Sequence, residues 1–179
     1  IDPQWVVTAS HCLKDRHQKI HIPKQERILP HGIIINTDFH KDPYDIALLK
    51  LDKPVQGVPK TKVYDGERLG VGSKTQEYGW GRSIFPWKYN LQTKSGYIIN
   101  ENNFNSRMTM NELNGIGKII PGDSSGPIFH NGEFYGALSG SPSIMTTIQD
   151  VFRFRGTRTE YTSMTCLLYT SPSPRDRQK

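Results

Sequence analysis

Three short segments of this 179-residue chain carry the groups that acyl transfer needs, namely a base, a carboxylate and a nucleophile. His11 directly follows the apolar run WVVTAS, where a strand can aim its imidazole into a cleft. Asp45 opens the apolar run DIALLKL, which favours a buried carboxylate reserved for the imidazole. Ser124 lies in GDSSGP, a glycine-flanked turn that can expose a hydroxyl and direct backbone N–H groups at one point. Together the three segments predict a nucleophilic acyl-transfer site.

The segments that must position these residues read as short β-strands. Runs of strand-forming residues recur between turn signals at Trp5 to Ala9, Gly32 to Asn36, Ile46 to Leu51, Lys74 to Tyr78, Gly96 to Asn100 and Gly132 to Ser139. No segment has the periodicity of a long amphipathic helix, and 16 Gly and 12 Pro suit tight connections. The pattern predicts an all-β barrel or sandwich, with a glycine-rich, charged divide at 65–73.

Composition argues against several other classes of protein. The net charge of +6 comes from 23 basic residues scattered among 17 acidic ones, which does not predict a nucleic-acid surface. No apolar run reaches membrane-spanning length, so no membrane partner is expected. Cys12 and Cys166 are too few for a disulfide framework and lack metal-ligand spacing. We therefore expect no metal and no cofactor.

Four segments, WVVTASHC, DIALLKL, YGWG and GDSSGP, resemble the histidine, aspartate, mid-domain and serine signatures of the trypsin/chymotrypsin-like serine proteases, in that order. The resemblance implies a chymotrypsin-like double β-barrel with its active site between the barrels. It also implies a monomeric endopeptidase that is secreted or periplasmic. Its expected partners are polypeptide substrates, which it hydrolyses, and proteinaceous inhibitors, which bind it. Only the motifs are specific, and the sequence between them is merely compatible with the family.

The resemblance assigns a role to each residue of the predicted catalytic triad. Ser124 attacks the peptide carbonyl, and His11 accepts its proton and later returns it to the leaving amine. Asp45 fixes the tautomer of the imidazole and stabilises the imidazolium. The backbone N–H groups of Gly122 and Ser124 form the oxyanion hole.

Two neighbours of Ser124 need separate expectations. The family has glycine after the nucleophile, so Ser125 is a departure that the turn tolerates if its φ stays negative. Asp123 resembles the family carboxylate that receives the amino group of a newly cleaved chain terminus.

Substrate specificity is predicted from two further segments. Lys118 lies six residues before Ser124, at the position that forms the base of the family's primary specificity pocket. Lysine there favours an acidic or polar side chain before the scissile bond. The alternative is a rearranged loop in which Lys118 points to solvent. The segment GALSGS resembles the family's substrate-binding strand, so Ser139, Gly140 and Ser141 are expected to line the cleft.

The sequence also suggests an incomplete copy of the family fold. Residues 1–68 are expected to form the remainder of the N-terminal barrel and 69–165 the C-terminal barrel, with the C-terminal helix absent. Only ten residues precede His11, where the family has two strands, and Cys12 lacks the upstream partner that the family's cysteine has. Residues 166–179 resemble a translated sequencing adapter, and a disordered Ser/Pro-rich tail is the alternative.

A second function remains open at this point. Ser125, Lys118 and Ile120 depart from the family pattern. These departures leave room for a catalytically silent, protease-like binding or regulatory module.

Overall fold

The computed structural model describes residues 2–13, 30–36, 45–81, 91–101, 107–112, 122–140 and 158–164. Nearly all of the regular structure in these ranges is β-strand, which confirms the predicted all-β class. The elements are β1 (Trp5–Thr8), η1 (Ser10–Leu13), β2 (Pro30–Asn36), β3 (Ala47–Leu51), β4 (Lys74–Gly79), β5 (Gln92–Glu101), β6 (Arg107–Glu112), β7 (Pro127–His130), β8 (Glu133–Gly140) and β9 (Arg158–Ser163). η1 is a single turn of 3-10 helix.

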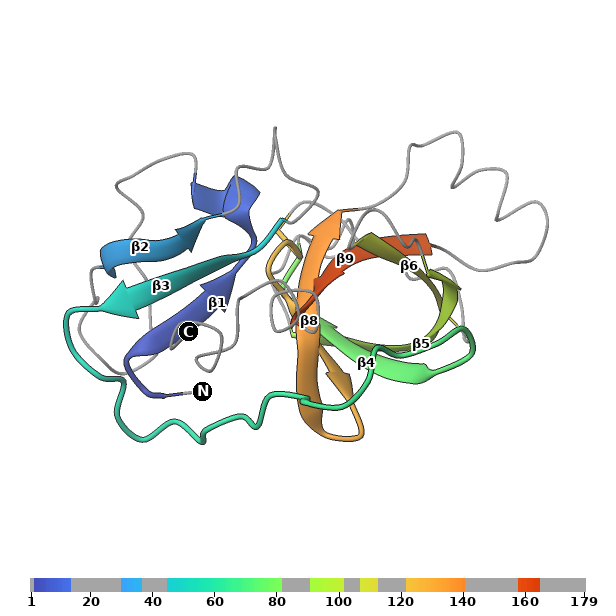
Figure 1. The fold of residues 1–179 in the computed structure, drawn as a ribbon, viewed down its shortest axis with the longest axis horizontal. Coiled ribbons are helices and arrows are strands. Elements are labelled where there is room, and N and C mark those ends of the chain that lie inside the picture. Colours follow the sequence, from blue (N-terminus) through green and yellow to red (C-terminus); the bar gives the residue numbers. More distant parts are fainter. Residues whose placement is uncertain are drawn as a thin grey trace, which may run out of the picture.

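The N-terminal strands form an antiparallel sheet in the order β1-β3-β2 (Figure 1). Along β3, Ala47, Leu49 and Leu51 are buried while the residues between them are half-buried. This period of two places the three apolar side chains on one face of the sheet. Within the described ranges this sheet has three strands and is open, and the incompleteness of the barrel stays a prediction.

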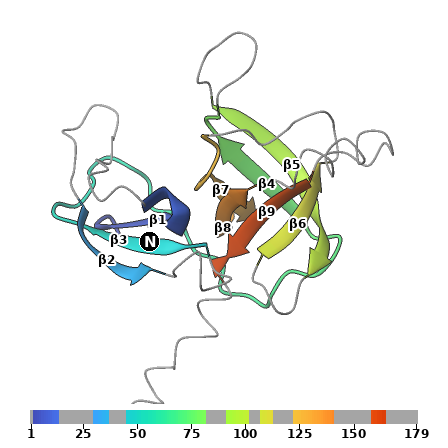
Figure 2. The ribbon, with the colours of Figure 1, turned by 90° about the horizontal axis from the view of Figure 1, so that it is seen from above.

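The C-terminal strands close into a barrel in the order β4-β5-β6-β9-β8-β7, sealed by pairing of β4 with β7. Figure 2 shows this barrel beside the N-terminal sheet, with β8 and β9 on the side that faces it. Its core consists of six buried residues, Leu69, Ile98, Ile128, Tyr135, Leu138 and Tyr161. Burial of each large side chain contributes about 1.5–3 kcal/mol, so the barrel supplies a rigid frame for the residues on its rim.

The connection between the two units is fastened to the barrel before it enters β4. The Tyr64 N–H donates to the Phe134 carbonyl at 2.9 Å, and the Phe134 N–H donates to the Lys62 carbonyl at 2.8 Å. The Tyr64 ring meets Tyr135 edge to face, with 5.5 Å between centroids. These contacts fix residues 62–64 of the connection against β8.

Three strands were not predicted from the sequence, namely β6, β7 and β9. β7 and β8 are joined by a two-residue turn of Asn131 (φ +50°) and Gly132 (φ +81°). An Asn-Gly pair is a strong hairpin signal, so β7 was within reach of sequence reasoning. The sequences of β6 and β9, RMTMNE and RTEYTS, contain few aliphatic residues. These two strands pair with each other inside a closed barrel, where neighbouring strands supply the backbone hydrogen bonds.

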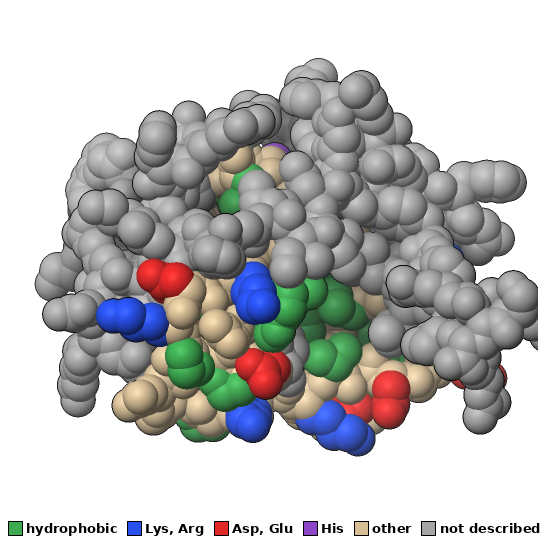
Figure 3. All heavy atoms as spheres, turned by 60° about the vertical axis from the view of Figure 1, so that its left-hand side comes forward, with side chains coloured by type: hydrophobic (Ala, Val, Ile, Leu, Met, Phe, Trp, Pro, Cys, Tyr) green, Lys and Arg blue, Asp and Glu red, His purple; other side chains and the backbone are tan. Residues whose placement is uncertain are grey.

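Two surface observations bear on the predicted partners. Within the ranges that the structure describes, no helix combines the length and apolar character that crossing a bilayer requires. Figure 3 shows basic and acidic side chains interspersed with hydrophobic ones on the described part of one face. This distribution agrees with the scattered charge expected from the sequence.

Candidate active site

His11 and Asp45 meet at the ends of two paired strands. His11 lies on η1 just after β1, and Asp45 lies two residues before β3. Because Thr8 of β1 pairs with Ala47 of β3, the two segments lie side by side. His11 Nδ1 is 2.5 Å from Asp45 Oδ2, and the His11 N–H donates to Asp45 Oδ1 at 2.9 Å. The Asp45 side chain is fully buried, whereas a quarter of the His11 side chain (25%) is exposed.

The C-terminal barrel also holds Asp45. The Ser139 hydroxyl of β8 donates to Asp45 Oδ2 at 2.6 Å, and the Asp45 N–H donates to Thr162 Oγ1 of β9 at 3.3 Å. Ser139 and Thr162 are themselves buried. Asp45 is therefore fixed from both structural units and lies at the seam between them.

Hydrogen bonding controls the charge states of the cluster formed by His11, Cys12 and Asp45. Burial alone would raise the pKa of Asp45, but hydrogen bonds from His11 and Ser139 outweigh it and lower this pKa. Hydrogen bonding to Asp45, and secondarily to the Cys12 thiol, raises the pKa of His11 from 6.5 to about 10. The same contact with His11 lowers the pKa of Cys12. In this arrangement the imidazole is protonated at neutral pH and paired with a carboxylate.

The GDSSGP turn is hydrogen-bonded to β8 of the barrel and is closed by a hydrogen bond of its own. The Ser125 N–H donates to the Leu138 carbonyl at 2.9 Å, and the Gly126 N–H donates to the Asp123 carbonyl at 2.9 Å. Gly122 has φ +103°, a conformation in which glycine is favoured. Among the described residues, no hydrogen bond occupies the N–H groups of Gly122 and Ser124. These two backbone donors lie on either side of Asp123.

The two serines of the turn have different surroundings. Ser124 is half-buried, and between described residues no hydrogen bond joins its hydroxyl to His11. Ser125 has φ +71°, so the expectation of a negative φ is wrong. The Ser125 hydroxyl accepts a hydrogen bond from the Ala9 N–H at 2.9 Å and lies 2.8 Å from Thr8 Oγ1. These contacts across the seam offset the cost of the left-handed backbone.

Asp123 explains the two glycines of the YGWG segment. Its carboxylate is buried, and Oδ1 accepts a hydrogen bond from the Gly81 N–H at 2.5 Å. A Cβ at Gly79 would clash with Asp123 Oδ1, and one at Gly81 would clash with Asp123 Oδ2. No side chain fits at either glycine while the carboxylate stays in place. The activation-linked role of Asp123 stays a prediction.

The predicted substrate-binding residues are only partly within the described ranges. Lys118 and Ser141 lie outside them, and Gly140 is a half-buried residue at the end of β8. Ser139, expected to line the cleft, directs its hydroxyl to Asp45. Sequence reasoning missed Thr162, because a threonine in a polar strand carries no signal of a partner 117 residues away.

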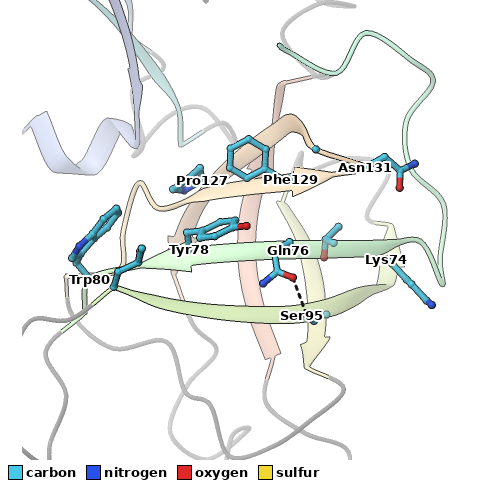
Figure 4. Close-up of a pocket in the computed structure, with 12 residues that line it drawn as sticks. Lys74, Gln76, Tyr78, Trp80, Ser95, Pro127, Phe129 and Asn131 are labelled. Carbon is cyan, nitrogen blue, oxygen red and sulfur yellow. Dashed lines mark hydrogen bonds between the residues drawn. The ribbon is translucent and has the colours of Figure 1, made fainter. Parts of the chain in front are cut away.

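A cavity of about 640 Å³ lies outside the cluster, against β4, β5 and β7 (Figure 4). Trp80, Tyr78, Pro127 and Phe129 form its apolar side, and Lys74 and Asn131 lie toward its other end. None of the predicted catalytic side chains is among its described lining residues. The cavity and the His11–Asp45 pair are therefore separate features.

Comparison with known proteins gives the same family as the motifs. The family model described as Trypsin matches residues 1–153. A renal glandular kallikrein of Mastomys natalensis is 25% identical over 181 aligned residues, which cover 80% of this chain and 68% of the relative. The thrombin-like enzyme acutin of Deinagkistrodon acutus is 29% identical over 170 residues, which cover 78% of this chain and 70% of the relative.

Solved structures share the fold at lower identity. Kallikrein-related peptidase 10 superposes with a TM-score of 0.71 at 19% identity, covering 94% of this chain and 83% of that one. A mutant of human heparin binding protein gives 0.70 at 17% identity, covering 97% and 86%. These likenesses show a chymotrypsin-like fold. Because the family model spans residues 1–153 of 179, the chain belongs to the trypsin family of serine proteases.

Proposed function

We propose that this protein is a serine endopeptidase that hydrolyses peptide bonds through an acyl-enzyme, with His11, Asp45 and Ser124 as its triad. The observation that carries the proposal is the His11–Asp45 pair. A fully buried carboxylate accepts from the imidazole at 2.5 Å and from the Ser139 hydroxyl at 2.6 Å. Burial of a carboxylate between these donors orients an imidazole and stabilises its positive charge, which is the role of the acidic member of a triad.

The geometry suggests how the steps are divided. With Nδ1 directed at Asp45, the neutral imidazole presents Nε2 to the nucleophile and takes the proton of Ser124 as its hydroxyl attacks the carbonyl. The N–H groups of Gly122 and Ser124 then stabilise the negative oxygen. His11 protonates the leaving amine, and afterwards activates the water that hydrolyses the acyl-enzyme. Asp45 stays ionised throughout.

The contacts of Ser125 support Ser124 as the nucleophile. The Ser125 oxygen accepts from the Ala9 N–H, lies against Thr8 Oγ1 and donates to Cys12 Sγ at 3.4 Å. An oxygen engaged in this way has no free lone pair for attack. Ser124 is the residue whose hydroxyl remains for substrate.

The substrate class follows from the family and from one residue. We propose a secreted enzyme that acts on polypeptides and prefers an acidic or polar side chain before the scissile bond, because of Lys118. Peptide substrates that end in Asp or Glu, in Arg or Lys, and in aromatic residues test this preference. Fastest cleavage after Arg would overturn it.

Labelling with a fluorophosphonate tests the proposal, since such a probe reacts covalently with an activated serine. We expect labelling of the unmodified chain, loss of labelling in Ser124→Ala, and retention in Ser95→Ala. Ser95 is the matched control because its hydroxyl donates to the Gln76 side chain, outside the cluster. Equal labelling of the unmodified chain and Ser124→Ala would contradict Ser124 as the nucleophile.

A catalytically silent binding module is the second candidate function. It is favoured by the missing Ser124–His11 hydrogen bond, by the positive φ of Ser125, and by the fold shared with heparin binding protein. Complete absence of labelling in a folded chain would favour this candidate.

A further inference from the structure

The Ser125 hydroxyl connects the turn that carries Ser124 to the segment that carries His11. It accepts a hydrogen bond from the Ala9 N–H at 2.9 Å, lies 2.8 Å from Thr8 Oγ1, and donates to Cys12 Sγ at 3.4 Å. A hydroxyl has one donor and two acceptor positions. With Thr8 donating, all three positions of this hydroxyl are filled by partners within residues 8–12, on both sides of His11.

The backbone of Ser125 shows that this arrangement has a cost. Its φ of +71° lies in the left-handed region, where a side chain is disfavoured and glycine is not. The only other non-glycine residue with positive φ in the described ranges is Asn131, which forms the tight turn between β7 and β8. That turn gives a local reason for Asn131. Ser125 also lies in a tight turn, which the Gly126 N–H closes by donating to the Asp123 carbonyl, but its hydroxyl has three long-range hydrogen bonds in addition.

Other contacts across the seam act on a different residue. Ser139 and Thr162 bind Asp45, and neither hydrogen bond reaches the turn that carries Ser124. Fixing Asp45 orients the imidazole, and it connects to the nucleophile turn only indirectly, because Ser139 follows Leu138, whose carbonyl accepts from the Ser125 N–H. The Ser125 hydroxyl joins the two segments on which the distance between imidazole and nucleophile depends.

We propose that Ser125 is a positioning residue, whose hydroxyl holds the nucleophile turn in register with the His11 segment across the seam between sheet and barrel. This inference rests on the proposed function. A glycine at this position would have no side-chain group for such a tether. Ser125 adopts an unfavourable backbone conformation, and its hydroxyl links the segment that carries the nucleophile directly to the segment that carries the base.

Ser125→Gly is the decisive substitution, because it removes the tether and relieves the positive φ together. We expect kcat to fall by about 10- to 100-fold with KM changed less than about twofold, since small misplacement of reacting groups has effects of this size. The thermal midpoint should change little, because relief of the backbone offsets lost hydrogen bonds. Asn131→Gly is the matched control, with the same backbone relief away from the site, and should keep kcat. Equal kcat in the two variants would overturn the tether.

The partner residue provides a rescue experiment. Thr8→Val removes the hydroxyl that faces Ser125, whereas Thr8→Ser keeps it. We expect Thr8→Val to lower kcat and Thr8→Ser to restore it. Equal kcat in both Thr8 variants would count against the proposal.

A measurement independent of catalysis separates this inference from the proposed function. In urea unfolding, Thr8→Val should reduce the folded-to-unfolded ratio both in the unmodified chain and in the Ser125→Gly variant. We expect the fold-reduction in the unmodified chain to exceed that in the Ser125→Gly variant by a factor of about five or more. Additive effects would overturn the tether even if Ser124 is the nucleophile. Coupling together with full hydrolysis by Ser124→Ala would keep the tether as a structural link and overturn the proposed function.

Discussion

Replacing Asp45 by asparagine tests the electrostatics of the proposed site, because Asp45 carries the negative charge that faces His11. The carboxylate accepts from His11 Nδ1 at 2.5 Å, from the His11 N–H at 2.9 Å and from the Ser139 hydroxyl at 2.6 Å. Asparagine keeps the shape but removes the charge and one acceptor oxygen. The imidazolium therefore loses its main stabilising partner.

The size of the effect follows from the pKa of His11. Its rise from 6.5 to about 10 corresponds to about 5 kcal/mol in favour of the protonated imidazole, at about 1.4 kcal/mol for each pKa unit. Because 25% of the His11 side chain is exposed, screening by water reduces this to a few kcal/mol. Asp45→Asn should lower the pKa of His11 by about two units or more. At pH values where His11 is neutral in both proteins, it should lower kcat by about 10⁴-fold, because the carboxylate no longer fixes the imidazole tautomer or stabilises the imidazolium.

An NMR titration of the His11 ring measures this pKa directly. All samples should carry Ser124→Ala to prevent self-digestion, and Asp52→Asn serves as the control because Asp52 is an exposed carboxyl just after β3. A His11 pKa near 6.5 in the parent sample would refute the reasoning, as would a pKa that Asp45→Asn leaves unchanged.

Three further predictions use the same structure. The rise of kcat/KM with pH should have its midpoint above neutral pH, because only the neutral imidazole acts as a base. Cys12→Ala should move this acid limb of the pH profile to lower pH, because it removes the thiol contact that helps to raise the pKa of His11. Thr162→Val should lower the free energy of unfolding in urea by about 1–3 kcal/mol, since it leaves the buried Asp45 N–H without its acceptor. Gly81→Ala should abolish fluorophosphonate labelling, because its Cβ would displace the Asp123 carboxylate.

Controls and contrary outcomes are specific to each change. Thr162→Ser keeps the acceptor and should recover most of the lost stability; equal losses in both Thr162 variants would show that the hydrogen bond is unimportant. Gly70→Ala adds a Cβ with nothing within 4 Å and should retain labelling, so loss there would point to a general effect of alanine. An acid limb that Cys12→Ala does not move would exclude the thiol as a cause of the raised pKa.

The His11–Asp45 pair also makes stability and activity respond to pH in opposite directions. Because the folded-state pKa of His11 is raised, the stability that His11 contributes while Asp45 is ionised is present below pH 6.5 and is lost as pH rises through about 10. Proton acceptance by His11 increases over the same interval. Urea unfolding across this range should therefore show falling stability while kcat/KM rises, and parallel changes would contradict the assignment.

The sequence predicts the strands and motifs whose signals are local. β1, β3 and β8 contain apolar or β-branched runs bounded by turn residues, and the motifs around His11 and Ser124 each lie within a few residues. Polar strands such as β9 carry no comparable signal, because their place depends on pairing within the closed barrel.

The contacts that hold the candidate site could not be predicted in the same way. Ser139 and Thr162 lie 94 and 117 residues from Asp45, and nothing in their local sequence names a partner. The positive φ of Ser125 was missed for the same reason, since its hydroxyl bonds to residues more than 110 positions away. From the local sequence, the Ser125 side chain is only a departure from glycine. The tertiary contacts show that its hydroxyl binds the His11 segment.

The close packing of Asp123 against Gly79 and Gly81 restricts the order in which these three positions can change. A side chain at either glycine requires the carboxylate to shift, so replacement of either glycine is disfavoured while Asp123 keeps its present position. Once Asp123 is lost, both glycines are released from this steric constraint. Substitutions at positions 79 and 81 in descendants of this protein should therefore follow a change at position 123, and such a change would mark a lineage in which the nucleophile turn had already been reshaped.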